Sequence, residues 1–264
     1  MFPSEGQISK YSFRQRAESA ARAGFKGIGL WHTDLEHTQA LMSLKDMKKI
    51  MDDNGIQYLE LEFLTDWFLD GPRKSESDRT KKLLFTASAE LGAKHIKVGD
   101  FYGSPVPMSK LVDSFGLLCK EAESFEATIG FEFMKGNAAG TLAKAVELST
   151  KTAAKNGGLI LDIAHMVSLH LPMEDLCAVP LQYLISVELN DGLLPENPAY
   201  DGWKRNFCGQ GHFDLQKYIQ CVEGSGYSGP WALEVFNPDY LNIPLDELNR
   251  LGFSTTMDQF ERIR

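Results

Sequence analysis

Cysteine is scarce in this sequence, and its spacing excludes two classes of protein. No CxxC pair is present among the four cysteines, which are Cys119, Cys177, Cys208 and Cys221. Structural zinc sites and disulfide-stabilised secreted domains place their cysteines in close, repeated spacings. We therefore interpret the four residues as reduced thiols of a cytoplasmic protein.

Long apolar runs and runs of positive charge are also missing. No apolar run reaches the roughly eighteen residues of a membrane-spanning helix, and the N-terminal stretch MFPSEGQISKYSFRQR has no apolar core of signal-peptide length. The net charge is −9, without a run of Lys or Arg that could follow a phosphate backbone. We expect a soluble protein with neither a membrane nor a nucleic acid as partner.

Motifs that bind phosphate or carry a nucleophile are absent as well. The sequence contains no GxxxxGK[ST], no GxGxxG between a strand and a helix, and no GxSxG elbow. These glycine-rich turns either hold phosphates on backbone N–H groups or expose a nucleophilic serine. The sequence therefore predicts neither a nucleotide cofactor nor covalent catalysis.

What the sequence does contain is an alternation of apolar runs with segments of helical periodicity, which is typical of βα units and a parallel sheet. Strands are expected at residues 27–31, 57–63, 95–99, 129–133, 158–163, 184–190 and 231–236. Helices are expected at residues 11–23, 43–54, 76–92, 108–126, 139–156 and 214–225. Gly24, Gly55 and Gly92 are expected to end three of these helices in the left-handed conformation. Residues 1–264 are thus predicted to form a single barrel domain.

Seven strands are one fewer than an eight-stranded barrel requires. Residues 2–9 contain Pro3 and Gly6 and make a poor strand. The expected fold is a (β/α)8-type TIM barrel whose first strand is absent or irregular. Because unpaired strand edges must be covered, we expect a gap filled by side chains such as Trp31 or by a partner chain, and a homodimer.

Four acidic residues stand late in otherwise apolar strands, namely Glu132, Asp162, Glu188 and Glu234. The carboxyl ends of barrel strands form the active-site face, and strand alternation points these four side chains inward. Converging carboxylates need a counter-charge, and all-oxygen ligands suit Mg²⁺ or Mn²⁺ better than Zn²⁺. The pattern predicts a divalent-metal site; the alternative for any single acid is a lysine partner or a helix cap.

The motifs that carry these acids resemble those of the xylose isomerase-like TIM-barrel superfamily. They are EFM, LDIAH, VELND, RNFCGQGHFD and GYSGPWALEVFN, and the resemblance extends from AARAGFKGIGLW onward. The superfamily includes sugar phosphate isomerases and epimerases, ketose 3-epimerases, inosose dehydratases and 3-dehydroshikimate dehydratases. The resemblance implies one divalent metal held by Glu132, Asp162, Glu188 and Glu234. It departs at Glu188, where relatives usually carry histidine, and a fourth carboxylate strengthens the preference for hard cations.

The same resemblance marks two residues that would bind substrate. His165 follows Asp162 by three positions, where it would hydrogen-bond a substrate hydroxyl or carboxylate unless it only caps a helix or shapes a loop. Arg205 precedes the glycines of GQG and would hold an anionic group of the substrate, the alternative being a surface acid.

Four further residues are candidates from their place in the strands. Lys97 lies mid-strand and points inward, so it would act on the substrate carbonyl or pair with Glu60 or Glu62 on the preceding strand. Glu62 ends its strand and would reach the pocket mouth. Trp31 and His32 stand where a βα loop is expected to leave its strand, and the aromatic side chain would stack on a sugar ring or fill the missing-strand gap.

Together these features predict an enzyme that transfers a proton next to the carbonyl of a small polyhydroxylated substrate. A bound metal would act as Lewis acid, and Glu132 and Glu234 would be the acid/base pair. The leading hypothesis is a metal-dependent sugar or sugar phosphate isomerase or epimerase. One alternative is a dehydratase of a cyclic keto-sugar or keto-acid, because elimination of a β-hydroxyl starts with the same step. The other is a non-catalytic ligand-binding relative whose metal site Glu188 has disrupted.

Overall fold

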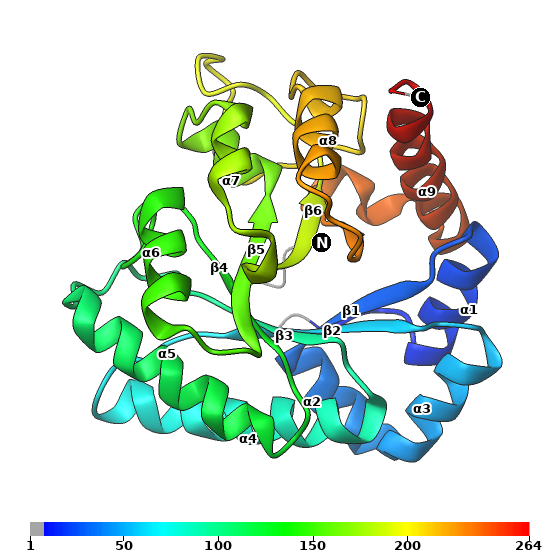
Figure 1. The fold of residues 1–264 in the computed structure, drawn as a ribbon. Coiled ribbons are helices and arrows are strands. Elements are labelled where there is room, and N and C mark those ends of the chain that lie inside the picture. The colour runs from blue at the N-terminus through cyan, green and yellow to red at the C-terminus, as the bar shows by residue number, and fades with distance from the viewer. Residues whose placement is uncertain (1–7, 264) are drawn as a thin grey trace. The chain divides into compact units, whose positions relative to one another are not determined.

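The structure is a computed structural model that describes residues 8–263 (Figure 1). The chain divides into two compact units within β5, at residues 159 and 160. We call residues 8–159 the N-terminal unit and residues 160–263 the C-terminal unit. The prediction of a single domain over residues 1–264 stays a prediction. Among the described residues, no helix has the length and apolar content of a membrane span.

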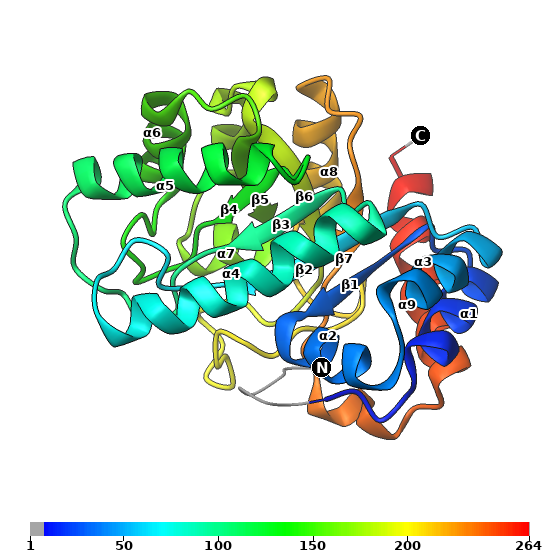
Figure 2. The same cartoon turned by 90° about the horizontal axis from the view of Figure 1, so that it is seen from below.

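Parallel strands form the centre of the N-terminal unit. They are β1 (Gly27–Trp31), β2 (Tyr58–Leu64), β3 (His95–Val98) and β4 (Ile129–Glu132). The helices of this unit are α1 (Phe13–Ala23), α2 (His32–Leu41), α3 (Leu44–Asp53), α4 (Pro72–Leu91), α5 (Met108–Glu123) and α6 (Leu142–Thr152). Figure 2 shows α4 running along β2 and β3, against which it packs. All residues of β3 and β4 are buried, as expected of central strands in a parallel sheet.

Local sequence signals set the helix ends in this unit. A capping box starts α1, because Ser12 accepts from the Gln15 backbone N–H and the Gln15 side chain accepts from the Ser12 N–H. Gly24 and Gly92 follow α1 and α4 in the left-handed conformation, with φ of 113° and 68°. Gly55 follows α3 with φ of 65°. The prediction that these three glycines end helices is confirmed.

The C-terminal unit continues the alternation of strands and helices. Its strands are β5 (Gly157–Asp162), which begins in the N-terminal unit, β6 (Leu184–Leu189) and β7 (Trp231–Leu233). Its helices are α7 (Ile163–Ser168), α8 (Leu215–Gly224) and α9 (Leu245–Glu261), with 3-10 turns η1 (Met173–Ala178), η2 (Leu181–Tyr183) and η3 (Pro238–Asn242). Strands β1 to β7 follow one another in the sheet in chain order. The parallel arrangement brings Asp162, Glu188 and Glu234 to the carboxyl ends of β5, β6 and β7.

The seven strands occur where the sequence predicts them, with bounds that agree to within one residue except in β7. That strand ends at Leu233, so Glu234 follows the strand instead of lying inside it. Helices α2, α7 and α9 are additional to the predicted set. The expectation of a poor strand at residues 2–9 falls largely outside the described residues; residues 8 and 9 belong to no strand. The covered gap and the homodimer stay predictions.

Candidate functional site

Three carboxylates of the C-terminal unit converge. Asp162, Glu188 and Glu234 each offer an oxygen, and these oxygens lie within 4.8 Å of one another. Asp162 and Glu188 are buried and Glu234 is half-buried. Buried acids this close are stable as anions only with a positive charge among them. For these three residues the predicted acidic cluster is confirmed, and it can hold a divalent metal.

Asp162 is the most constrained of the three. Its Oδ1 accepts hydrogen bonds from the Ala164 backbone N–H at 2.8 Å and from Asn190 Nδ2 at 2.7 Å. Its Oδ2 is buried without a hydrogen-bond partner among the described residues, and it lies 3.6 Å from His165 Nε2 and 3.9 Å from Arg205 Nη2. Burial alone would raise the pKa of Asp162, but the charges of His165 and Arg205 and the two hydrogen bonds lower it. The side chain is thus an anion with one oxygen available to a cation.

The helix-cap alternative for Asp162 is also realised. Asp162 is the N-cap of the short helix α7, which carries His165 one turn later. The cap uses Oδ1 and leaves Oδ2 for the cluster. The cap therefore does not exclude Asp162 from a metal site. His165 itself is buried, and its Nε2 lies 3.6 Å from Asp162 Oδ2; its predicted contact with substrate stays a prediction.

Arg205 is fully buried, which rules out the alternative of a surface partner. Its side chain is 2% exposed, and Nη1 donates to the Gly202 carbonyl at 2.9 Å. Its backbone N–H donates to the Phe236 carbonyl at 2.8 Å, two residues after Glu234. Nε has no hydrogen-bond partner among the described residues. A buried guanidinium with a donor to spare is suited to an anionic ligand group.

Two residues of the VELND motif help to build this site, although the sequence did not predict them as site residues. Asn190 orients Asp162, and its own Oδ1 is buried without a hydrogen-bond partner among residues 8–263. Asp191 shapes the following loop, because its carboxylate accepts from the backbone N–H groups of Gly192, Gly209 and Phe213. The signal in the sequence was the run of polar residues directly after the apolar strand.

A second buried group of charges lies in the N-terminal unit. Lys97 is 0% exposed, and its Nζ lies 3.1 Å from Glu62 Oε2 and 3.4 Å from Glu60 Oε1. Glu60 also contacts His95 Nε2. The alternative that Lys97 pairs with Glu60 or Glu62 is therefore realised with both. Glu132, the last residue of β4, is buried in the same unit.

The two glutamates beside Lys97 differ in acidity. Burial disfavours the charge of Glu60, but Lys97 and His95 outweigh it and lower the pKa of Glu60 from 4.5 to about 2. Burial raises the pKa of Glu62, Lys97 opposes this, and the charges of Glu60 and Glu132 add to the rise. Glu60 is thus the fixed anion of the pair.

Replacing Glu60 by Gln is expected to lower stability by about 2–4 kcal/mol at neutral pH, because His95 and Lys97 lose a buried counter-charge. The folded-state pKa of Glu60 lies below its ordinary value, so its contribution is complete above pH 4.5 and is lost as the pH falls toward 2. Urea unfolding from pH 7 to pH 2 should show the difference between wild type and Glu60→Gln shrinking in that window. Glu147→Gln, in an exposed pair with Lys151, is the control and should change little. A difference that is independent of pH would contradict this assignment.

Trp31 and His32 lie in a continuous strand-to-helix junction and not in the predicted loop. Trp31 ends β1 and His32 begins α2, which leaves no residue between them. The Trp31 ring stacks near Phe63 and Phe101, at 5.8 Å and 6.1 Å between centroids. His32 Nδ1 accepts from the Phe63 N–H at 3.4 Å. Burial and the nearby charge of Arg79 lower the pKa of His32, so it is neutral near pH 7.

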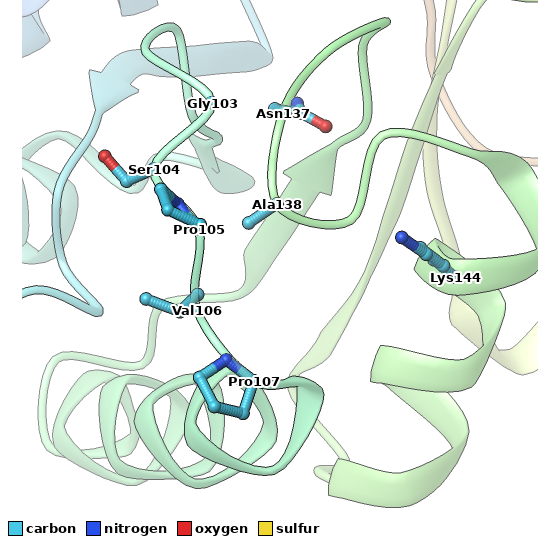
Figure 3. Close-up of a pocket in the computed structure, with 8 residues that line it drawn as sticks. All are labelled: Gly103, Ser104, Pro105, Val106, Pro107, Asn137, Ala138 and Lys144. Atoms are coloured by element: carbon cyan, nitrogen blue, oxygen red, sulfur yellow. The ribbon is translucent and has the colours of Figure 1, made fainter.

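A hollow of about 420 Å³ lies between the loops that leave β3 and β4 (Figure 3). Its lining residues are Gly103, Ser104, Pro105, Val106, Pro107, Asn137, Ala138 and Lys144. Asp100 joins the two loops by accepting from the N–H groups of Tyr102, Gly103 and Ala138. None of the residues predicted to bind metal or substrate lines this hollow. The predicted chemistry and the hollow therefore do not coincide.

Sequence comparison gives three curated relatives with named activities, which are two 3-dehydroshikimate dehydratases and an inosose isomerase. The 3-dehydroshikimate dehydratase of Pseudomonas aeruginosa is 30% identical over 242 residues, which are 87% of this chain. The chain spans only 37% of the length of that protein. The activity of the whole relative therefore suggests a hypothesis for this chain but does not establish its activity.

Structural comparison shows the fold. A structure titled IOLI protein with a binding zinc atom superposes with a TM-score of 0.87 at 21% identity, covering 96% of this chain and 95% of the other. A D-allulose 3-epimerase from Methylomonas sp. superposes with a TM-score of 0.72 at 18% identity, covering 96% and 94%. The family model of the xylose isomerase-like TIM barrel matches residues 17–254. The expected fold class and resemblance are confirmed, and the chain belongs to the xylose isomerase-like TIM-barrel family.

Proposed function

We propose that this chain is a divalent-metal-dependent dehydratase of a cyclic, hydroxylated keto-acid of the 3-dehydroshikimate type. The observation that carries the proposal is the acidic cluster beside a buried arginine. Asp162, Glu188 and Glu234 would supply oxygen ligands, and Arg205 would offer a substrate carboxylate its Nε, which has no hydrogen-bond partner within residues 8–263. A neutral sugar would leave that buried donor without a partner, which costs about 1–3 kcal/mol.

The dehydratase replaces the isomerase or epimerase as the leading hypothesis. Both reactions begin with removal of a proton next to a carbonyl, so the acids alone do not separate them. The named dehydratase relative supports elimination, at 30% identity over most of this chain. The epimerase structure supports the fold alone.

Within this proposal the residues take distinct roles. Asp162, Glu188 and Glu234 would hold the metal, with Glu132 as the fourth ligand, and a bound metal would polarise the substrate carbonyl as a Lewis acid. Arg205 and His165 would bind the carboxylate and a hydroxyl, and Trp31 and His32 would border the ring.

Elimination then needs two proton transfers. Glu132 or Glu234 would accept the proton from the carbon next to the carbonyl. The C–O bond of the β-hydroxyl breaks, its electron pair leaves with oxygen, and a proton added to that oxygen makes water. Loss of one water from a 3-dehydroshikimate-type ring, followed by enolisation, gives a dihydroxylated aromatic acid.

The test is an assay of the purified chain with 3-dehydroshikimate. Ultraviolet absorbance of a catechol product should appear, should disappear after chelation, and should return with Mg²⁺ or Mn²⁺. Metal analysis of the same sample addresses the non-catalytic alternative. If no catechol forms while D-fructose is epimerised at C3 under the same conditions, the dehydratase proposal is wrong and the epimerase hypothesis replaces it.

Glu188→His is expected to keep a divalent metal bound but to shift preference from Mg²⁺ toward Zn²⁺ by roughly tenfold or more, because imidazole suits softer ions. Competition between the two metals during titration measures the shift. Glu223→His, on the exposed side of α8, is the matched control and should leave selectivity unchanged. Unchanged selectivity in Glu188→His would show that this carboxylate is not a ligand.

A further inference from the structure

Two of the four cysteines lie side by side in the C-terminal unit, where η1 packs against α8. Cys177 is exposed near the end of η1, and Cys221 is half-buried on α8. The Cys221 thiol donates a hydrogen bond to the sulfur of Cys177. Neither residue belongs to the acidic cluster or lines the hollow, so the proposed function gives this pair no role.

An ion pair between the same two helices shows how η1 and α8 face each other. Lys217 Nζ on α8 lies 2.9 Å from Glu174 Oε1 on η1. Residues three apart eclipse in a 3-10 helix, and residues four apart share one face of an α-helix. Cys177 is three residues after Glu174, and Cys221 is four residues after Lys217. Both steps advance about 6 Å along the helix axis, so the two cysteines meet one turn beyond the ion pair.

The other two cysteines do not compete with this pair. Cys119 and Cys208 are each 1% exposed, and burial raises the pKa of each thiol to about 12. Oxidants and alkylating reagents react with an accessible thiolate, so thiols of this kind are inert in the folded protein. Oxidation under native conditions is therefore confined to Cys177 and Cys221.

The two exposed thiols differ in their access to an oxidant. Burial raises the pKa of the Cys221 thiol, the neighbouring Cys177 adds to the rise, and the charge of Lys217 opposes it. Cys221 is thus a thiol near neutral pH, half-buried and hydrogen-bonded. Cys177 is the sulfur that an oxidant in solution meets first, and Cys221 lies next to it as the second sulfur.

We propose that Cys177 and Cys221 are a dithiol that peroxide oxidises to a reversible disulfide between η1 and α8. The Cys177 thiolate attacks one oxygen of hydrogen peroxide, the O–O bond breaks, and the departing hydroxide takes the proton that the thiol released and leaves as water. The Cys221 sulfur then attacks the sulfenic sulfur of Cys177. The S–O bond breaks, and its oxygen leaves with the Cys221 proton as a second water. The two electrons lost by the sulfurs are those that the peroxide gains.

The disulfide would have a measurable effect on stability. It would close the loop of residues 177–221, which lowers the entropy of the unfolded chain. It would also hold η1, the segment that follows α7, against α8. We expect the Tm of the oxidised protein to rise by about 5–10 °C and to return after reduction with dithiothreitol.

The experiment exposes the whole chain to a small excess of hydrogen peroxide and then alkylates the remaining thiols without unfolding. Two thiols should react before oxidation and none afterwards. Mass mapping of peptides should find the Cys177 peptide joined to the Cys221 peptide within one chain, lighter by two hydrogens than the two thiol peptides together. Dithiothreitol should restore both thiols.

Serine variants of each cysteine test the order of the two steps. In Cys221→Ser, the sulfenic acid of Cys177 should persist and be trapped by dimedone. In Cys177→Ser, Cys221 should react with peroxide at least about tenfold more slowly than Cys177 does in wild type. Cys119→Ala is the matched control, because it removes a buried cysteine and should leave the disulfide and its Tm shift unchanged. Separate oxidation of the two sulfurs to sulfinic acids, a disulfide between two chains, or the same Tm rise in Cys177→Ser would overturn the proposal.

Discussion

Asp162→Asn is expected to abolish metal binding at micromolar metal and to lower kcat/KM by roughly 10³-fold or more, because the cluster loses the anionic oxygen that faces it. The substitution keeps the shape of the side chain. Its amide oxygen can still cap α7 by accepting from Ala164, but its Nδ2 would face the cationic Arg205. We therefore expect a loss of about 1–2 kcal/mol in stability, too small to unfold the protein.

Metal titration and the dehydration assay on the same preparation measure this effect. Asp214→Asn is the matched control, because Asp214 caps α8 in the same unit by accepting from the Lys217 N–H at 3.1 Å. It should retain metal and activity and lose little stability, because asparagine caps a helix about as well as aspartate. If Asp162→Asn still binds metal at wild-type affinity, the three converging carboxylates are not a metal site.

The strands and the acids were predictable because both depend on local pattern. A charged residue such as Glu188 in the apolar run LISVELN is conspicuous, and its burial without loss of fold requires a partner of opposite charge. Strand bounds follow from apolar runs that end at glycine or at polar residues. Asp162 could therefore be placed at a strand end from sequence alone.

Partners that depend on the path of the chain were not predictable. Lys97 was expected to act on substrate or to pair with either of two glutamates, and the register of β2 and β3 brings it to both. Asp191 organises a loop by accepting from Gly209 and Phe213, residues 18 and 22 positions later. No periodicity in the sequence encodes such contacts.

Helix α9 was missed for a different reason. Its start carries an ordinary signal, since Pro244 precedes it and Asp246 and Glu247 occupy its first turn. Few of its residues are buried, however, and its apolar positions are too sparse to mark a helical face. The end of strand β7 was also predicted too late. Only three of its residues pair, although the run WALEVF continues to Phe236. Tertiary contacts, and not the pattern, decide where pairing stops.

Arg205→Met is expected to raise KM for 3-dehydroshikimate by roughly 10²- to 10³-fold, because a bidentate guanidinium–carboxylate contact would be lost. The comparison that isolates this contact uses the methyl ester of the same substrate. Wild-type protein should prefer the acid strongly, whereas Arg205→Met should turn over acid and ester with similar KM. Arg205→Lys keeps the charge but not the fork of donors, so it should recover only part of the preference.

Lys204→Met is the matched control for this experiment. Lys204 is adjacent in sequence and also cationic, but its side chain is 46% exposed and pairs with Asp239 at 2.6 Å. Its removal should leave the preference for the acid intact, which excludes a general effect of positive charge near the site. Because Arg205 also lies 3.9 Å from Asp162, metal content must be measured in each variant. A variant that keeps its metal and still prefers the acid would show that another residue binds the carboxylate.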